Sequence, residues 1–175
     1  MSTGGLLVRS NALPQVRIGT QTWMAANYDF NGSDVNGVYT NVNSYGKLYT
    51  WTEANAIVYP GWHLPTYEEY QTLITYLGGG TVAGGKLKAS GTTYWTTPNT
   101  GADNSSGFDA RGSGIYSSGG AGYTMFNQQA WFWTSSTLGG YAYVVALTYT
   151  SASRFINGVD YTADVRCSIR LIRDT

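Results

Sequence analysis

The sequence has 175 residues, only 11% of which are charged, and its formal net charge is zero. A chain of this length fits one domain with one core, and it lacks the excess positive charge that attracts proteins to nucleic acids or anionic membranes. Apolar residues make up 42% of the chain, and glycine and tyrosine are abundant. This composition excludes disorder and favours a loop-rich fold filled with aromatic side chains.

Cys167 is the only cysteine, so the sequence excludes an intrachain disulfide and a cysteine-based zinc site. We expect this side chain to be a small buried hydrophobe. Residues 1–9 lack the basic segment and long apolar run of a secretory signal, and the chain has no run that could span a membrane. The sequence therefore predicts no signal peptide and no direct membrane insertion.

The first predicted elements are a hairpin and a helix. Two short β-prone runs flank Gly19 and Thr20 within residues 16–30, which predicts a hairpin with Trp23 in the core. After a turn-rich stretch, residues 45–57 place leucine, tryptophan, threonine and asparagine side chains at helical spacing. This spacing predicts a first helix.

A second helix has both of its ends specified. Thr66 and Glu69 form a capping box at its start, and the glycines at 78–80 can close its last turn. One face carries the apolar positions i, i+3, i+4 and i+7, namely Tyr70, Leu73, Ile74 and Leu77. We expect this face to contact a core that also contains Trp51 and Trp133.

The remainder of the chain is predicted to be loops followed by strands. Residues 79–122 are rich in Gly, Ser, Thr and Asn, which indicates long ordered loops with short strands. Turns are predicted at Gly139-Gly140 and Asn157-Gly158. Four later strands are expected near residues 131–135, 141–148, 152–157 and 164–172.

The C-terminal segment has an unusual composition. Residues 134–175 contain no Lys, Glu, Gln, Met or Trp, whereas the chain before them holds all six tryptophans and all three methionines. Tyrosine recurs there among Ser, Thr, Gly and Asn, which is the chemistry of selected binding surfaces. The alternative is that these residues simply form β-hairpins, because Tyr, Thr, Val and Phe favour strands. The two interpretations are compatible.

The residue types of catalysis do not assemble into a site. His63 is the only histidine, and we expect it to hydrogen-bond a neighbouring loop rather than act as a base or metal ligand. Ser135 and Ser136 have no base beside them. The loop 99–106 offers oxygen atoms for Ca²⁺, but its spacing is not a calcium motif. We therefore expect no enzyme, no metal and no cofactor.

Several separated motifs carry a resemblance to a known family. One is Pro-Gly-Trp-His-Leu-Pro-Thr at 60–66; the others lie at 18–27, 45–51, 85–89, 107–108, 133–136 and 165–167. In this order, over about residues 16–174, they resemble the Fibrobacter succinogenes major paralogous domain. That family is similar to the C-type lectin fold in the branch that contains the formylglycine-generating enzyme and the variable proteins of diversity-generating retroelements.

The resemblance implies an α+β C-type lectin fold, with two helices around a small, mostly antiparallel sheet and long Gly-rich ordered loops. The strand near 16–18 is expected to pair with the one near 168–172, which brings the termini together. Residues 1–15 are expected to be an N-terminal extension and residues 16–175 a ligand-binding domain. Formylglycine-type oxidation needs a pair of cysteines, which this chain does not have.

In retroelement-diversified relatives, adenine mutagenesis converts asparagine codons to many others, but never to Lys, Glu, Gln, Met or Trp. The resemblance therefore implies a variable region at about 134–165. Fixed scaffold positions are expected at Trp133, Ser135, Ser136, Ala142, Leu147 and 165–167. The expected ligand-binding positions are Tyr141, Tyr143, Val145, Thr148, Tyr149, Thr150, Ser153, Arg154, Phe155, Asn157 and Tyr161.

The function implied by the resemblance is non-enzymatic recognition of a protein or glycan on a target surface, by a protein displayed on a virion or cell surface. The alternative is a structural or adhesive module of a bacterial surface lipoprotein or fimbrial assembly whose C-terminal segment does not vary. Neither interpretation involves nucleic acid, and the oligomeric state is left open.

Overall fold

The computed structural model describes residues 13–29, 42–120 and 122–175. This part of the chain contains ten strands: β1 (Gln15–Ile18), β2 (Gln21–Met24), β3 (Trp62–His63), β4 (Ile115–Ser117), β5 (Gly122–Thr124), β6 (Gln129–Leu138), β7 (Tyr141–Thr148), β8 (Arg154–Asp160), β9 (Val165–Arg166) and β10 (Ile172–Arg173). Its helices are α1 (Val42–Tyr45), α2 (Trp51–Asn55), α3 (Tyr67–Tyr76) and α4 (Ala83–Leu87). None of these helices is long and apolar enough to cross a membrane.

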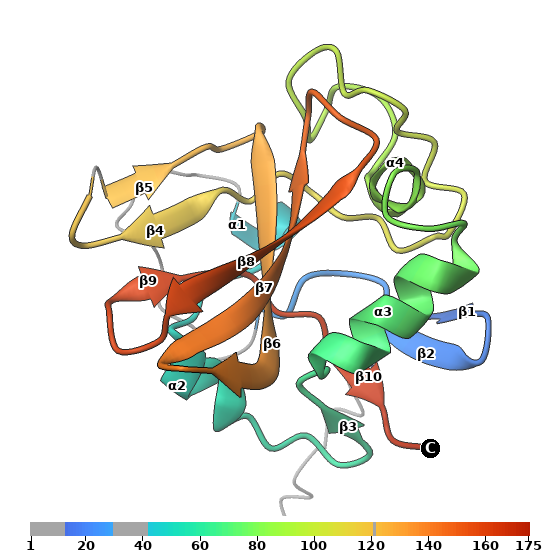
Figure 1. Cartoon of the computed structure of the whole chain (residues 1–175). Helices are drawn as coiled ribbons and strands as arrows, with labels where there is room; N and C mark the ends of the chain where they lie inside the picture. Colours follow the sequence, from blue (N-terminus) through green and yellow to red (C-terminus); the bar gives the residue numbers. More distant parts are fainter. Residues whose placement is uncertain (1–12, 30–41, 121) are drawn as a thin grey trace, which may run out of the picture.

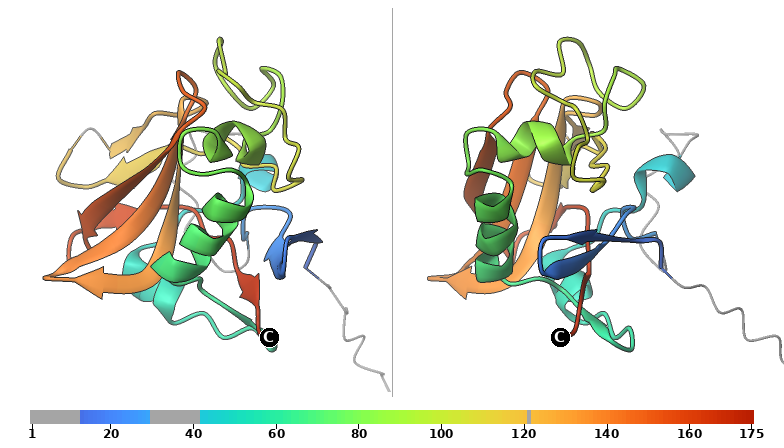
Figure 2. Two further views of the ribbon diagram at one scale, coloured as in Figure 1. Left: turned by 45° about the vertical axis from the view of Figure 1, so that its right-hand side comes forward. Right: turned by 90° about the vertical axis from the view of Figure 1, so that its right-hand side faces the viewer.

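The strands form three antiparallel sheets (Figure 1), with the orders β1-β2-β10-β3, β5-β4-β9 and β6-β7-β8. The expected α+β C-type lectin architecture, with two helices around one small sheet, is therefore wrong. The described chain is mainly β, and only α3 has as many as 10 residues. Figures 1 and 2 show α3 on one side of the β6-β7-β8 sheet and the β4-β5-β9 sheet toward its other side.

The predicted first helix is shortened because its start is used in strand-like pairing. Tyr49 exchanges two backbone hydrogen bonds with Cys167, at 2.9 and 3.0 Å. Gly46 has a φ of 74°, which ends α1 and is unfavourable for other residues. Helix α2 therefore begins only at Trp51, behind a capping box formed by Thr50 and Glu53.

The predicted N-terminal hairpin is confirmed, since β1 and β2 pair across a turn in which Gly19 has a φ of 61°. The prediction that the first strand pairs with the last strand is wrong. Ile172 in β10 lies opposite Trp23 of β2 and His63 of β3, whereas β1 pairs only with β2. The C-terminal strand is thus inserted between two earlier strands, which ties the end of the chain into the fold.

Helix α3 forms as its sequence predicts. The Thr66 hydroxyl accepts the Glu69 N–H at 3.1 Å, and the Glu69 carboxylate accepts the Thr66 N–H at 2.7 Å. Gly78, at a φ of 101°, follows the helix at a position where other residues would be strained. The helix buries Tyr70, Leu73 and Ile74.

The core consists of two clusters on opposite sides of the β6-β7-β8 sheet. Alternate strand residues point to opposite faces, so Phe132 and Val145 join the first cluster, while Trp133 and Val144 join the second. The apolar face of α3 packs into the first cluster. The prediction that this face meets Trp51 and Trp133 is therefore wrong, because both tryptophans belong to the second cluster.

A buried arginine links segments that are far apart in the sequence. Arg170 is fully buried and donates to the Asn27 side chain and to the carbonyls of Met24, Phe108 and Asp109. Its guanidinium also lies 4.4 Å from the centre of the Phe108 ring. Burial lowers the pKa of Arg170 to about 9, so the group remains charged at neutral pH and depends on these acceptors.

Leu73→Ala tests the packing of α3. Leu73 is fully buried, so we expect the variant to lose about 2–5 kcal/mol of unfolding free energy through lost burial and a residual cavity. Thr75→Ala, at an exposed position of the same helix, should change stability by no more than about 0.5 kcal/mol. Urea denaturation measures both variants, and equal midpoints would contradict this assignment of the core.

Candidate binding surface

The expected ligand-binding residues lie on one hairpin and the segment just after it. The register of β7 with β8 is unbroken, from Tyr141 opposite Asp160 to Leu147 opposite Arg154. The candidates fall on β7, its loop, β8 and just beyond: Tyr141, Tyr143, Val145 and Thr148; Tyr149, Thr150 and Ser153; Arg154, Phe155 and Asn157; and Tyr161. The fold therefore brings them into one region.

Within the hairpin, the candidates point to two different faces. Tyr141, Tyr143 and Val145 share the face toward α3, where the rings of Tyr143 and Tyr67 lie 5.1 Å apart. Phe155 and Asn157 lie opposite Ala146 and Val144, on the other face. A single ligand that contacts all of them would have to reach around the outer strand, β8.

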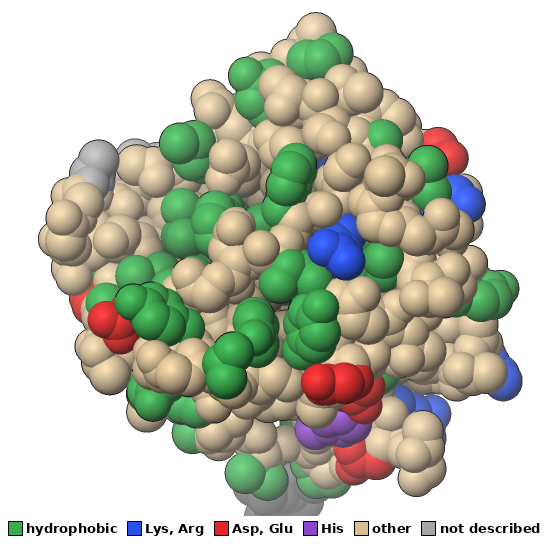
Figure 3. All heavy atoms as spheres, viewed as in Figure 1, with side chains coloured by type: hydrophobic (Ala, Val, Ile, Leu, Met, Phe, Trp, Pro, Cys, Tyr) green, Lys and Arg blue, Asp and Glu red, His purple; other side chains and the backbone are tan. Residues whose placement is uncertain are grey.

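Their exposure also differs. Tyr141 and Phe155 are 53% and 43% exposed, and Thr150 and Asn157 are exposed as well. Val145 is fully buried in the first core cluster. The half-buried candidates are Tyr143, Thr148, Tyr149, Ser153, Arg154 and Tyr161. Figure 3 shows hydrophobic side chains gathered over the β7–β8 region with few charged groups between them.

The loop between β7 and β8 is held by a buried lysine. The Nζ atom of Lys88 donates at 2.9 Å to the carbonyls of Thr148, at the end of β7, of Ser151 in the loop, and of Thr100. Lys88 is completely buried, and this burial lowers its pKa to about 8. Since three carbonyls face the ammonium group, it can satisfy all three only in its charged form.

Close backbone contacts fix the same loop from outside. A Cβ atom on Gly84 would lie 2.4 Å from the Ser153 carbonyl oxygen, and one on Gly101 would lie 2.7 Å from Ala152. The N–H of Gly85 donates to the Ala152 carbonyl at 2.9 Å. Figure 2 shows this loop beside α4 and the following loops, at one end of the molecule. Only glycine allows the loop to approach so closely.

Arg154 lies at the start of β8, and its guanidinium group makes few hydrogen bonds within the described chain. Its N–H donates to the Gly80 carbonyl at 2.9 Å, and its guanidinium makes one long bond of 3.4 Å to Gln71. Its Nε atom is buried and has no acceptor within the described chain, and no carboxylate there pairs with it. The guanidinium is therefore weakly restrained.

An irregularity in β6 connects the sheet to α3. The register of β6 with β7 shifts between Trp133 and Thr137. Within this irregular stretch, the Ser135 N–H donates to the Pro65 carbonyl and the Ser136 hydroxyl accepts the Tyr67 N–H. These two serines, expected to be fixed scaffold positions, therefore join the start of α3 to the sheet.

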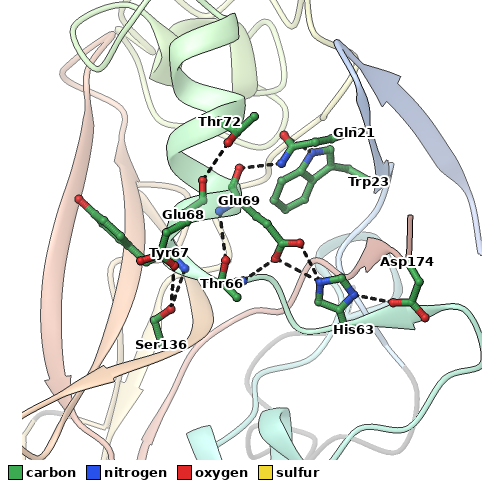
Figure 4. A network of polar contacts seen from close by, with 10 residues as sticks. All are labelled: Gln21, Trp23, His63, Thr66, Tyr67, Glu68, Glu69, Thr72, Ser136 and Asp174. Atoms are coloured by element: carbon green, nitrogen blue, oxygen red, sulfur yellow. Dashed lines mark hydrogen bonds and ion pairs between the residues drawn. The ribbon is translucent and has the colours of Figure 1, made fainter.

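His63 lies between two carboxylates (Figure 4). Its Nδ1 atom is 2.6 Å from Asp174, and its Nε2 atom is 2.9 Å from Glu69, which also caps α3. Burial alone would lower the pKa of His63, but the hydrogen bonds to Asp174 and Glu69 outweigh it and raise the pKa. The histidine thus bonds to neighbouring segments, and it ties the C-terminal segment to the start of α3.

These polar groups do not form a nucleophile with its base. Ser136 contacts Tyr67 and Glu68 rather than His63 (Figure 4). Cys167 is fully buried, and its burial raises the pKa of the thiol, which leaves it protonated and inaccessible.

Two residues that shape this surface were not predicted to belong to it. Lys88 lies in the motif at 85–89, where Lys86 has similar small and apolar neighbours but is only half-buried, so the sequence does not single out Lys88 as buried. Tyr67 follows the capping residue of α3, and its sequence position gives no sign that it meets Tyr143. Both contacts join segments that are distant in sequence, so local pattern cannot reveal them.

Comparison with known proteins gives one match. The family model described as the Fibrobacter succinogenes major domain matches residues 16–173, which is nearly the whole chain. No curated protein and no solved structure matches it. The matched region includes every strand and helix described above, apart from the first residue of β1.

Lys88→Met tests the clamp on the loop. The variant has a side chain of similar length but removes the donor that three carbonyls share, and within the described chain only the Thr148 carbonyl keeps another bond, from the Ser151 N–H at 3.5 Å. We therefore expect the unfolding free energy to fall by about 3 kcal/mol or more. Lys86→Met, at a half-buried position two residues earlier, in α4, should change it by about 0.5 kcal/mol or less. Urea unfolding followed by circular dichroism separates the two, and similar midpoints would show that the clamp contributes little.

His63 should make stability depend on pH. Because its folded pKa is raised, its stabilising contribution is complete below the unfolded pKa and is lost as pH rises through the folded pKa. The melting temperature of the parent should therefore exceed that of His63→Gln most at acidic pH, and the gap should narrow at alkaline pH. As His63 is the only histidine, a gap that stays constant across this range would exclude its titration as the cause.

Proposed function

Because the chain belongs to the Fibrobacter succinogenes major domain family, we propose that it is a non-enzymatic ligand-binding domain whose C-terminal region, at about 134–165, is diversified by a retroelement. The observation that carries the proposal is that this region contains both buried and exposed positions, in the places expected for scaffold and ligand-binding residues. Expected scaffold residues such as Ala142 and Leu147 are buried, whereas Tyr141, Phe155 and Asn157 on the same hairpin are exposed.

This division is what a variable binding surface needs. Exposed substitutions usually change stability by about 0.5 kcal/mol or less, so the exposed positions can vary while the buried ones hold the sheet. The absence of Lys, Glu, Gln, Met and Trp after Trp133 also supports diversification, since adenine mutagenesis of asparagine codons cannot produce them. Val145, which is buried, would influence a ligand only through packing.

The proposed ligand class follows from the side chains that are exposed on this surface. Tyr141 and Phe155 present large, rigid apolar area, and Thr150 and Asn157 add adaptable hydrogen-bonding groups. The face seen in Figure 3 carries few charges and the formal net charge of the chain is zero, so a polyanion such as nucleic acid is disfavoured. We propose a protein or glycan on a target surface as the ligand, with the domain itself displayed on a virion or a cell surface.

A second function is favoured by the packed tyrosines. Tyr143 contacts Tyr67, Tyr161 lies 4.9 Å from Trp51 between ring centres, and Tyr149 packs against the first core cluster. Tyrosines that are engaged within the domain suit a structural or adhesive module of a bacterial surface lipoprotein or fimbrial assembly, without diversification. The two proposals differ in whether these positions vary.

The nucleotide sequence around the gene distinguishes the two functions. Diversification requires a near-copy of the 3′ end of the coding sequence that differs at adenines, beside a gene for a reverse transcriptase. Deep sequencing of a growing population should then show changes concentrated in codons of the exposed positions Tyr141, Thr150, Phe155 and Asn157. A locus without such a copy would leave the structural module as the better proposal.

Binding and stability should be separable on this surface. We expect the double variant Tyr141→Ala and Phe155→Ala to keep its melting temperature within a few degrees, while a true anchor residue costs about 2 kcal/mol or more of affinity when it is truncated. Leu147→Ala, at a buried position of the same hairpin, is the matched control and should destabilise the fold. Binding is screened on arrays of bacterial surface proteins and glycans. A loss of cooperative unfolding in the double variant would indicate packing rather than recognition.

A further inference from the structure

The β6-β7-β8 sheet has an open edge. Strand β8 pairs with β7 on one side, and within the described chain no strand pairs with its other side. Its seven residues, Arg154–Asp160, contain neither lysine nor proline, and its register with β7 has no bulge. Monomeric proteins protect such edges with these devices, so the edge of β8 is suited to pairing.

The backbone groups that point outward can be identified from the hydrogen bonds of β6. Trp133 donates to Ser168, and Ser168 donates to Trp131, so the groups of both tryptophans point away from β7. Strand pairs alternate between bonded and non-bonded, and therefore their partners Val144 and Ala146 bond to β8. It follows that Phe155, Asn157 and Val159 bond to β7. The outward groups belong to Arg154, Ile156, Gly158 and Asp160.

The hydrogen bonds at the ends of β8 agree with this pattern and limit the open stretch. The outward N–H of Arg154 donates to Gly80, and the carbonyl of Asp160 accepts from Ala163 at 3.4 Å. The carbonyl of Arg154, both groups of Ile156 and Gly158, and the N–H of Asp160 have no partner within the described chain. These six backbone groups are available to another strand.

We propose that β8 pairs with β8 of a second copy of this chain, antiparallel and centred on Asn157. In this register, Ile156 lies opposite Gly158 of the other copy and exchanges two hydrogen bonds with it. Arg154 lies opposite Asp160, and the free carbonyl of one meets the free N–H of the other. The second bond of this pair would join the Arg154 N–H to the Asp160 carbonyl, but both of these groups already have partners within the chain, so each Arg154–Asp160 pair makes one backbone bond.

The side chains also select this register. Arg154 and Asp160 have no ion pair within the described chain, and the twofold axis would bring them together twice on the face toward α3. On the other face, the exposed ring of Phe155 lies opposite Val159, an apolar pair of the kind that stabilises sheets. A shift by two residues in either direction separates the opposite charges, so it loses both ion pairs.

The pairing would join two three-stranded sheets into one continuous sheet. Tyr141 and Tyr143 lie on the same face as Arg154, so the surfaces of the two copies would lie side by side on this sheet. Two linked surfaces bind a repetitive target more tightly than one, without any new contact to the ligand. Because one short strand contributes the edge, we expect a weak dimer that dissociates on dilution.

Charge reversal tests the register. Arg154→Asp and Asp160→Arg each place like charges opposite one another, and each should weaken dimer formation by about tenfold in sedimentation equilibrium. An equimolar mixture of these two variants should form a heterodimer, since opposite charges then face each other at both ends. The double variant should regain self-association. Circular dichroism verifies that each variant is folded.

Asp103→Arg is the matched control. Asp103, like Asp160, is a surface aspartate that accepts the N–H two residues later, and reversing its charge away from the edge should leave the dimer unchanged. Ile156→Pro removes one outward N–H without touching the bonds to β7, and it should abolish dimerisation while the protein stays folded. This second variant keeps the test valid if Arg154→Asp does not fold.

Three results would overturn the proposal. The first is a parent protein that stays monomeric up to its solubility limit. The second is a dimer that Asp160→Arg and Ile156→Pro leave intact, and the third is a mixture of the charge-reversed variants that does not associate. Either of the last two would show that the copies meet through another surface.

Discussion

The fold depends on a charge that is buried without an opposite charge. Arg170 must place its donors on acceptors, because an ionised group removed from water is very costly unless it is hydrogen-bonded. Three of its acceptors are carbonyls in the segments at Met24, Phe108 and Asp109, and the fourth is the side chain of Asn27. Any arrangement that separates these segments leaves the guanidinium unsatisfied.

This requirement explains how a chain with long loops keeps one conformation. The loop that contains Phe108 and Asp109 has little regular structure, yet it is fixed by Arg170 from the C-terminal segment and by the packing of Phe108 against Trp23 and Phe132. The C-terminal segment in turn crosses between β2 and β3 through Ile172. The regions before and after the hairpin are thus locked to each other, and the hairpin is supported from both of its faces.

Features encoded by neighbouring residues were predictable from the sequence. The capping box of Thr66 and Glu69 and the turn at Gly139-Gly140, where both φ angles are positive, need only adjacent residues and formed as predicted. Asn157-Gly158 carries an equally strong turn signal but lies inside β8, because pairing with Val144 and Tyr143 extends the strand through it. That prediction was wrong because a long-range contact decided the outcome.

The architecture and the binding surface were less predictable for the same reason. A helix does form within residues 45–57, but it begins only at Trp51, because Tyr49 pairs through its backbone with Cys167. The candidate positions were located on the correct strands, while their exposure depended on which face of the sheet each one met. Val145 and Tyr141 lie on the same face of β7, with only Tyr143 between them on that face. Val145 is nevertheless buried in the cluster that includes α3, whereas Tyr141 is exposed.

The clamp at Lys88 has a consequence for how this protein can evolve. Its three acceptors are main-chain carbonyls, which every amino acid supplies, so these three bonds do not depend on the side chains at 148–151, even though Tyr149 packs against the first core cluster. The loop can therefore change an exposed side chain such as that of Thr150 and keep its backbone fixed. It also has little conformational entropy left to lose when a ligand arrives, so each new set of side chains starts from a rigid support.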